Sequence, residues 1–228
     1  MKILKENEVL DDLQLNELHI IQNINDYRFT CDSVLLSDFV KIGHKDNVVE
    51  FCSGSGVISI LINEKYKPRK ITGFEIQPYL CEMSNRSLKY NSITNIEFVN
   101  LDLSKACSEV GCEKTDVLVC NPPYYNINAI KGEINQKYKV TKYETLTNLE
   151  KIFKSAEKIL KFGGKFFLVH ISNRIQEIMS LAQKFDFSCK ELQLVYPNNK
   201  KLSHLALFYF TKKGKSGCNV LKPIILNS

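Results

Sequence analysis

The chain contains no tryptophan, and only ten of its 228 residues are glycine and six proline. It also lacks long apolar runs: the longest, residues 57–62, is far too short to span a bilayer, and the first residues hold no signal-peptide core. With 44% hydrophobic and 25% charged residues, the chain can bury the core of one compact domain, and wholesale disorder is not expected. We therefore expect a soluble, cytoplasmic protein that has no membrane partner.

Cysteine spacing of the zinc-binding type is missing as well. The eight cysteines, at positions 31, 52, 81, 107, 112, 120, 189 and 218, form no Cys-x-x-Cys pair. Cys120 lies inside an apolar run, as expected for a reduced thiol that acts as a small hydrophobe. The histidines, His19, His44, His170 and His204, show no ligand spacing. We therefore expect reduced thiols, structural histidines and no metal site.

Acidic residues are absent after Glu191, whereas six lysines follow it. These lysines account for the whole formal net charge of +6. Such a basic region often contacts nucleic acid phosphates, although a solvated lysine-rich surface explains it equally well. The candidate RNA-binding residues are Arg28, Lys200, Lys201, Lys212, Lys213 and Lys215.

Short apolar runs alternate with helical patterns, which predicts βαβ units around a parallel sheet. The predicted strands cover residues 47–51, 70–75, 96–100, 115–120, 164–170, 187–196 and 202–211. The predicted helices cover residues 57–64, 79–91, 146–160 and 174–184. Because a short turn joins the last two strands, we expect an α/β fold with a seven-stranded, mostly parallel sheet, one antiparallel strand and helices on both faces.

The domain organisation follows from this pattern. We expect a single domain over residues 1–228, with an N-terminal segment at 1–45, the α/β core at 46–211 and a basic C-terminal tail at 212–228. Residues 125–145 are polar and show no clean periodicity, so they are expected to form a long loop after the fourth strand. Long loops in compact domains commonly carry function.

The first predicted strand of the core runs into a glycine turn that contains Gly54 and Gly56 and then into a helix. These glycines allow a ligand close to the backbone, and the helix N-terminus offers unpaired N–H groups. A dinucleotide site would need a third glycine where this chain has Ser59. Glu75 ends the second strand, where it can accept hydrogen bonds from ribose hydroxyls, and Asp102 follows the third, where it can accept from an adenine amino group. Together these features predict a crevice for S-adenosylmethionine, which carries no phosphate.

The tetrad Asn121-Pro122-Pro123-Tyr124 follows the fourth strand and indicates the chemistry. The prolines fix the turn and leave backbone carbonyls free, since proline has no N–H. The side-chain oxygen of Asn121 and the carbonyl of Pro122 are two acceptors that suit an NH₂ group, and Tyr124 offers a flat face to a planar substrate. The alternative is a plain turn that ends a strand. The tetrad favours methyl transfer to an amine, catalysed mainly by positioning.

With these motifs the chain resembles the amino-methyltransferases of the Rossmann-like class I fold, and more narrowly the bacterial tRNA1(Val) adenine-37 N6-methyltransferases. The narrower resemblance rests on residues 27–36 (Tyr-Arg-Phe-Thr-Cys-Asp-Ser-Val-Leu-Leu), 163–166 (Gly-Gly-Lys-Phe), 173–174 (Asn-Arg) and 222–225 (Lys-Pro-Ile-Ile). It covers residues 10–226. Two stretches depart from the family pattern: residues 52–53 in the glycine turn, and residues 142–144 on the approach to the following helix.

The resemblance implies roles for individual residues. The implied cofactor-binding residues are Thr30, Asp32, Glu50, Cys52, Gly54, Gly56, Glu75, Ile76, Asp102, Leu103 and Asn121. The implied catalytic residues are Asn121, Pro122, Pro123 and Tyr124. The implied reaction is N6-methylation of an adenine in tRNA, namely adenine 37 in the anticodon loop of tRNA1(Val).

Three alternatives remain open. A glutamine N5-methyltransferase of a translation release factor uses the same Asn-Pro-Pro-Tyr turn, but such enzymes usually carry a separate N-terminal helical domain, and only 46 residues precede the first core strand here. A guanine N2-methyltransferase of ribosomal RNA is the second. The third is an RNA-binding module without catalysis, against which the intact tetrad and Glu75 argue.

Overall fold

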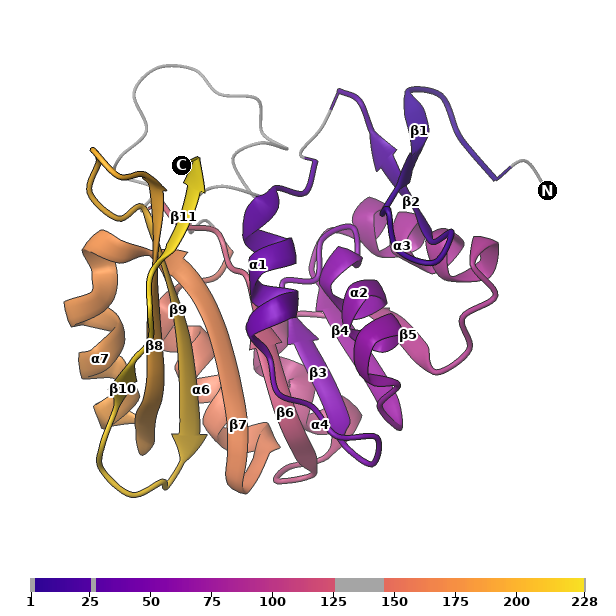
Figure 1. The fold of residues 1–228 in the computed structure, drawn as a ribbon. Helices are drawn as coiled ribbons and strands as arrows, with labels where there is room; N and C mark the ends of the chain where they lie inside the picture. The colour runs from indigo at the N-terminus through magenta and orange to yellow at the C-terminus, as the bar shows by residue number, and fades with distance from the viewer. Residues whose placement is uncertain (1–2, 26–27, 126–145, 228) are drawn as a thin grey trace.

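The computed structural model describes residues 3–25, 28–125 and 146–227 (Figure 1). The strands are β1 (Glu8–Asp12), β2 (His19–Asn23), β3 (Asn47–Phe51), β4 (Lys70–Glu75), β5 (Ile96–Asn100), β6 (Thr115–Cys120), β7 (Leu160–Ile171), β8 (Phe187–Asn198), β9 (Leu205–Lys212), β10 (Asn219–Val220) and β11 (Ile224–Asn227). The helices are α1 (Cys31–Phe39), α2 (Val57–Tyr66), α3 (Pro78–Tyr90), α4 (Ala106–Val110), α6 (Leu149–Ile159) and α7 (Ile175–Lys184), with 3-10 turns η1 (Leu103–Lys105) and η3 (Ser172–Arg174). The loop expected at 125–145 lies outside the described residues except for Tyr125.

The central sheet confirms the predicted fold class. Its strand order is β10-β8-β9-β7-β6-β3-β4-β5, and β11 pairs with β8. The pairs that join β3 to β7 through β6, and β3 to β5 through β4, are parallel, whereas β9 is antiparallel to both β7 and β8. The seven predicted strands are therefore present with β9 as the antiparallel one. The stretch expected as a tail adds two short strands, β10 and β11, beside β8.

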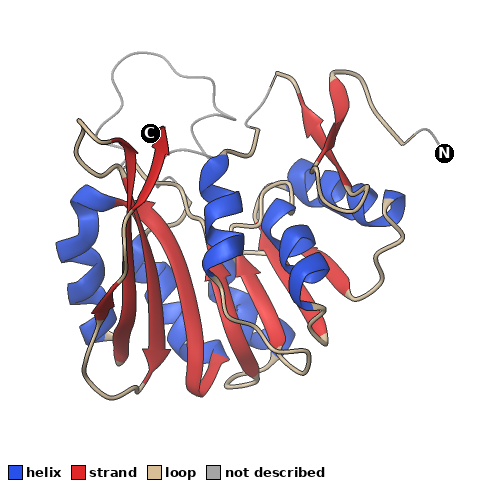
Figure 2. Cartoon of the chain, viewed as in Figure 1, coloured by secondary structure: helices blue, strands red, loops and turns tan. Residues whose placement is uncertain are grey.

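Helices cover both faces of this sheet, each over its own apolar core (Figure 2). On one face α1, α2 and α3 pack over side chains such as Val48, Val119 and Phe167. On the other face α4, α6 and α7 pack over Phe166, Phe208 and their neighbours. The helix predicted over residues 146–160 is α6, which covers Leu149–Ile159 because β7 already begins at Leu160.

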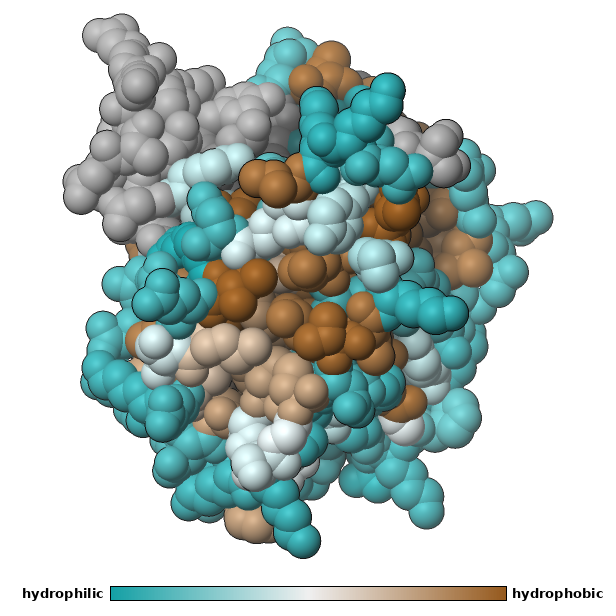
Figure 3. All heavy atoms as spheres, turned by 60° about the vertical axis from the view of Figure 1, so that its left-hand side comes forward, coloured by the Kyte–Doolittle hydropathy of each residue, from teal (hydrophilic) through white to brown (hydrophobic). Residues whose placement is uncertain are grey.

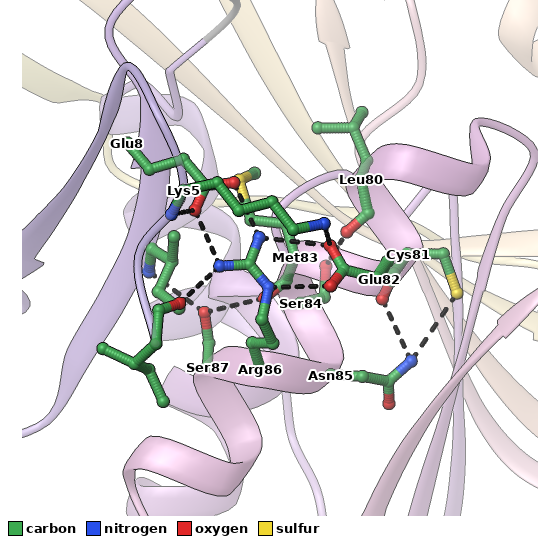
Figure 4. A network of polar contacts seen from close by, with 12 residues as sticks. Lys5, Glu8, Leu80, Cys81, Glu82, Met83, Ser84, Asn85, Arg86 and Ser87 are labelled. Carbon is green, nitrogen blue, oxygen red and sulfur yellow. Dashed lines mark hydrogen bonds and ion pairs between the residues drawn. The ribbon is translucent and has the colours of Figure 1, made fainter. Parts of the chain in front are cut away.

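The N-terminal hairpin, formed by β1 and β2, docks on α3 through a buried arginine (Figure 4). The guanidinium of Arg86 donates to Glu8 on β1 at 2.6 Å and to Glu82 at 2.9 Å, and Arg86 is only 4% exposed. Removal of one partner of such a buried pair costs about 3–5 kcal/mol, because a charge is left uncompensated. On β2, the side-chain oxygen of Gln22 accepts from the Phe29 N–H at 2.9 Å. The hairpin therefore also holds the segment that leads into α1.

The cysteines depart from expectation at one place. Cys107 and Cys112 are joined as a disulfide across the end of α4, so the expectation that all thiols are reduced is wrong for this pair. Cys81 and Cys120 are buried free thiols, and for Cys120 the apolar run around it predicted this burial.

The side of the molecule formed by β8, β10 and β11 carries apolar side chains across its middle, bordered by hydrophilic ones (Figure 3). Val220, Ile225 and Leu226 are the exposed apolar residues that the two C-terminal strands contribute. Within the described residues, no helix has both the length and the apolarity needed to cross a bilayer.

Candidate active site

A cavity of about 430 Å³ opens at the carboxyl ends of β3, β4, β5 and β6. Parallel strands deliver the residues that follow them to one edge of the sheet, so segments distant in sequence meet there. Its wall includes nearly all the residues expected to bind a cofactor or form the catalytic turn: Thr30, Asp32, Glu50, Cys52, Gly54, Glu75, Ile76, Asp102, Leu103, Asn121, Pro122, Pro123 and Tyr124. Of the expected residues, Gly56 does not line the cavity.

The glycine turn packs tightly against the ring of Phe98 on one side and leaves open space on the cavity side. Gly56 has a φ of 82°, and a Cβ on it would lie 2.3 Å from the ring of Phe98. Gly73 of β4 meets the same ring, where a Cβ would lie 2.5 Å away. Gly54 has a φ of 54°, and no atom lies within 4 Å of the place where its Cβ would be. The turn therefore leaves free space next to the backbone on the cavity side, where a ligand can approach closely.

Glu75 is 5% exposed, and two backbone N–H groups hold its carboxylate. Gly54 donates to Oε2 at 2.8 Å and Gln77 donates to Oε1 at 2.9 Å. Burial raises the pKa of this carboxyl, while the bonds from Gln77 and Gly54 oppose the shift. A carboxylate oxygen accepts more than one hydrogen bond, so both oxygens keep capacity for hydroxyl donors.

Two further groups of the wall fit a polar, cationic ligand. The Ser53 hydroxyl is buried and has no hydrogen-bond partner among the described residues, as expected of a site that a ligand completes. Glu50 is 1% exposed, and both the N–H of Ser59 (3.1 Å) and the Ser59 hydroxyl donate to its Oε2. Burial nevertheless raises the pKa of Glu50 to about 8, and the charge of Glu75 adds to the shift. A cation bound nearby favours the ionised form of Glu50.

Asp102 takes part in an ion pair at the cavity wall. Lys151 of α6 donates to Oδ2 at 2.6 Å, and the Ser104 N–H donates to Oδ1 at 2.9 Å. Burial raises the pKa of Asp102, but the bonds from Lys151 and Ser104 outweigh burial and hold this pKa below its usual value. Lys151 also donates to the Leu146 carbonyl at 3.1 Å. Asp102 is therefore a charged acceptor, as the sequence suggested, but one that already has a cationic neighbour.

The turn from Asn121 to Tyr124, which follows β6, faces the first turn of α1. The Tyr124 hydroxyl lies 2.7 Å from Oδ1 of Asn121 and 2.8 Å from Oδ2 of Asp32. The side-chain nitrogen of Asn121 donates to Oγ of Ser33 at 3.1 Å. Asp32 thus contacts this turn, in addition to the cofactor-binding role that the resemblance implied.

His170, at the carboxyl end of β7, packs against Tyr124 with ring centroids 5.0 Å apart. The imidazole is fully buried, and neither ring nitrogen has a partner in the part of the chain that the structure describes. Burial, and then the charge of Arg174, lowers the pKa of His170 to about 3, so the ring is neutral at physiological pH. His204, also expected to be structural, instead lines the cavity.

The five lysines among the candidate RNA-binding residues fall into two separate groups. Lys200 and Lys201 are exposed on the turn between β8 and β9, at the carboxyl end of β8 and hence at the cavity edge. Lys212 ends β9, which runs antiparallel to β7, so it lies with exposed Lys213 and Lys215 at the opposite edge of the sheet. Lys212 is 1% exposed, donates to Glu113 at 3.0 Å and lies 3.4 Å from Glu157, so its expected contact with RNA is wrong.

Arg28 is half exposed and forms an ion pair with Asp11 of the hairpin at 2.5 Å.

The sequence motifs did not predict Ser33, Ser53 or Lys151 as cavity residues. Ser33 lies within residues 27–36, which resemble the family, so the sequence could have indicated it as a cavity residue. Nothing in the sequence indicated Lys151, because its place at the cavity depends on where α6 packs. No group of three or more potential metal ligands occurs among the described residues.

The chain matches the family model Methyltransferase small domain over residues 30–193, which is more than half its length. The protein belongs to this family. One similar curated relative is the tRNA1(Val) (adenine(37)-N6)-methyltransferase of Vibrio vulnificus, 22% identical over 178 residues that cover 78% of this chain and 72% of the relative. Another is the Release factor glutamine methyltransferase of Fusobacterium nucleatum, 23% identical over 163 residues, or 68% of this chain and 46% of that relative. A similar solved structure is M. jannaschii TYW2 in complex with AdoMet, with a TM-score of 0.61, 13% identity and coverage of 92% and 88% of the two chains.

Family and fold together make the protein an S-adenosylmethionine-dependent methyltransferase. The cofactor supplies an electrophilic methyl group when bound. The residues of the cavity fit this cofactor. Glu75 can accept hydrogen bonds from ribose hydroxyls, and Asp102 can accept one from an adenine amino group. Glu50, when ionised, can balance the positive charge of the cofactor. Asn121 stands in the same wall, and its side-chain oxygen lies 2.7 Å from the Tyr124 hydroxyl. The chain's own contribution to methyl transfer would be to hold the acceptor group in line with the methyl carbon.

Proposed function

We propose that this protein methylates N6 of an adenine in tRNA, and that the target is adenine 37 in the anticodon loop of tRNA1(Val). The observation that carries the proposal is the turn from Asn121 to Tyr124, placed in the wall of the cofactor cavity. An amide oxygen next to an aromatic face suits an exocyclic amine on a planar base. The relative from Vibrio vulnificus, which covers most of this chain, bears the same activity in its name.

The target base has to leave the anticodon loop stack so that its amino group can reach the methyl carbon. Tyr124 then offers a face for stacking, which is worth about 1–3 kcal/mol per base. Lys200 and Lys201 stand at the same edge of the sheet and are suited to contact the phosphates beside the extruded base. Lys213 and Lys215 lie at the other edge and are left out of the proposed interface.

The experiment is methylation of tRNA from a strain that lacks the gene, with labelled cofactor and nucleoside mass spectrometry. N6-methyladenosine is expected with the wild type and absent with Asn121→Ala. Because the side chain of Asn121 acts mainly in the transition state, cofactor affinity should stay nearly unchanged in that variant. Unmethylated tRNA in the presence of active, cofactor-bound wild-type protein would refute the proposal.

A second candidate is N5-methylation of a glutamine in a translation release factor. The similarity to the Fusobacterium nucleatum enzyme supports it, although this chain spans under half of that relative. A carboxamide also presents an NH₂ group to Asn121. N5-methylglutamine in a release factor, with tRNA untouched, would establish this second candidate in place of the first.

A further inference from the structure

The side chain of Asn121 is held from two sides. Its nitrogen donates to Oγ of Ser33 at 3.1 Å, and its oxygen lies 2.7 Å from the hydroxyl of Tyr124. Ser33 is 4% exposed and belongs to the first turn of α1, 88 positions away in sequence. Within the described residues, this contact is the only side-chain hydrogen bond of the Ser33 hydroxyl.

The two ends of a carboxamide are not equivalent in the proposed reaction. An oxygen accepts a hydrogen bond from a substrate N–H, whereas a carboxamide rotated by 180° would turn its own NH₂ donors toward the substrate amine. A rotated Asn121 would therefore oppose binding of the amine. Something must keep the nitrogen end turned away from the substrate.

The Tyr124 hydroxyl indicates which side the substrate takes. Its hydrogen can be donated to the Asn121 oxygen, so it occupies the kind of position that a substrate N–H would need. Ser33 lies at the other end of the carboxamide and receives the nitrogen. In this arrangement the carboxamide oxygen faces Tyr124 and the nitrogen faces α1, with Ser33 acting as the acceptor that receives the nitrogen.

We propose that Ser33 is a positioning residue for methyl transfer, which fixes the carboxamide of Asn121 with its oxygen toward the substrate amine. This inference rests on the proposed function only in requiring an N–H donor as substrate, and it applies equally to an adenine and to a glutamine amide. In this proposal Ser33 acts through Asn121 and does not itself bind the reacting nitrogen. Its effect should therefore fall on turnover and leave cofactor binding unchanged.

Ser37 provides a matched control on the same helix. It is buried, as Ser33 is, but its hydroxyl donates to the Val34 carbonyl at 2.7 Å and accepts from Lys65 at 2.9 Å, both remote from Asn121. Ser37→Ala therefore reports what the loss of a buried hydroxyl from α1 does by itself. Ser33→Thr keeps a hydroxyl at the position of interest.

The test compares Ser33→Ala, Ser33→Thr and Ser37→Ala with the wild type by steady-state kinetics, calorimetric cofactor titration and thermal unfolding. We expect Ser33→Ala to lower kcat about 10- to 100-fold with cofactor Kd unchanged. Ser33→Thr should restore kcat to within a few-fold, and Ser37→Ala should keep kcat even if its Tm falls. An unchanged kcat in Ser33→Ala, or a parallel loss of cofactor affinity, would overturn the inference.

A second readout does not depend on activity. In NMR spectra of the wild type, the side-chain NH₂ of Asn121 should exchange slowly with solvent, because Ser33 accepts from it. Exchange should become fast in Ser33→Ala and stay slow in Ser33→Thr and Ser37→Ala. Equal exchange rates in all four proteins would refute the positioning role, whereas a wild type that methylates neither tRNA nor release factor would refute only the proposed function.

Discussion

The hydroxyl oxygen of Tyr124 lies 2.8 Å from Oδ2 of Asp32, which stands 92 positions earlier in the sequence. The same hydroxyl lies 2.7 Å from the Asn121 oxygen, and its single hydrogen can serve only one of these acceptors at a time. When a substrate amine takes the oxygen of Asn121, the hydroxyl is left to donate to Asp32. In the proposed reaction, Asp32 therefore keeps the ring of Tyr124 in place while the ring receives the substrate.

Tyr124→Phe should consequently lose activity, although less than Tyr124→Ala. Phenylalanine keeps the ring face but loses a bond to a charged acceptor, worth about 1.5–3 kcal/mol when well formed, and partial exposure of Asp32 lowers that value. Asp32→Ala removes the same bond from the other side. The double variant Asp32→Ala/Tyr124→Phe should therefore be no worse than Tyr124→Phe alone. Single effects on kcat that simply add would show that the contact plays no part in transfer.

The proposed contact of Glu75 with the cofactor can be tested by binding measurements. Glu75→Ala removes the proposed ribose acceptor and should weaken S-adenosylmethionine binding by about 1–3 kcal/mol. Loss of the Glu75 carboxylate also frees the N–H groups of Gly54 and Gln77, so Tm has to be followed in parallel. Calorimetry is the measurement, with NAD as the negative ligand because the third glycine of a dinucleotide site is absent. Unchanged affinity for S-adenosylmethionine would remove Glu75 from the site.

The sequence predicted those secondary-structure elements whose pattern lies within one short stretch of the chain. The core strands that run into the cavity were predicted to the residue, because their apolar runs are bounded by polar residues on both sides. The N-terminal hairpin and α1 were not predicted. Polar residues of β1 and β2 are held by tertiary contacts, such as that of Glu8 with Arg86, and a local sequence pattern does not reveal such contacts. Helix α1 carries no regular apolar stripe.

The same distinction explains the errors at the site. Glu75 and Asp102 could be placed because the end of a strand fixes their position. Lys212 was misassigned because charge in a sequence does not reveal the edge of the sheet on which it falls. Its burial against Glu113 and Glu157 follows from the antiparallel course of β9, which sends it away from the cavity.

The raised pKa of Glu50, about 8 in the folded protein, predicts a pH dependence. The folded state holds a proton that the unfolded state has already released above the ordinary pKa of 4.5, so the free energy of unfolding should fall as pH rises toward 8. Between pH 6.5 and 8 the slope due to this group approaches at most about 1.4 kcal/mol per pH unit. The measurement is denaturant unfolding across this range without cofactor. Glu50→Gln should flatten the curve, and a wild-type curve already as flat as that of the variant would contradict the assignment.

Cofactor binding should also change the protonation of Glu50. S-adenosylmethionine is cationic and favours ionised Glu50, so its binding near pH 7 should release protons and tighten as pH rises toward 8. Calorimetry in two buffers of different ionisation enthalpy measures the release. Glu50→Gln should abolish it, and proton uptake by the wild type would rule out this coupling.

The last prediction uses the two lysine groups as controls for each other. Lys200→Ala/Lys201→Ala removes two charges at the cavity edge, and Lys213→Ala/Lys215→Ala removes two at the far edge. Each phosphate contact contributes about one to the slope of log K against log salt concentration, so the first double variant should lower that slope by about two and weaken tRNA binding. The second should leave both nearly unchanged, although the net charge falls equally. Equal losses in the two variants would mean that long-range charge attracts the RNA, and a loss confined to the second would place the interface on the opposite edge of the sheet.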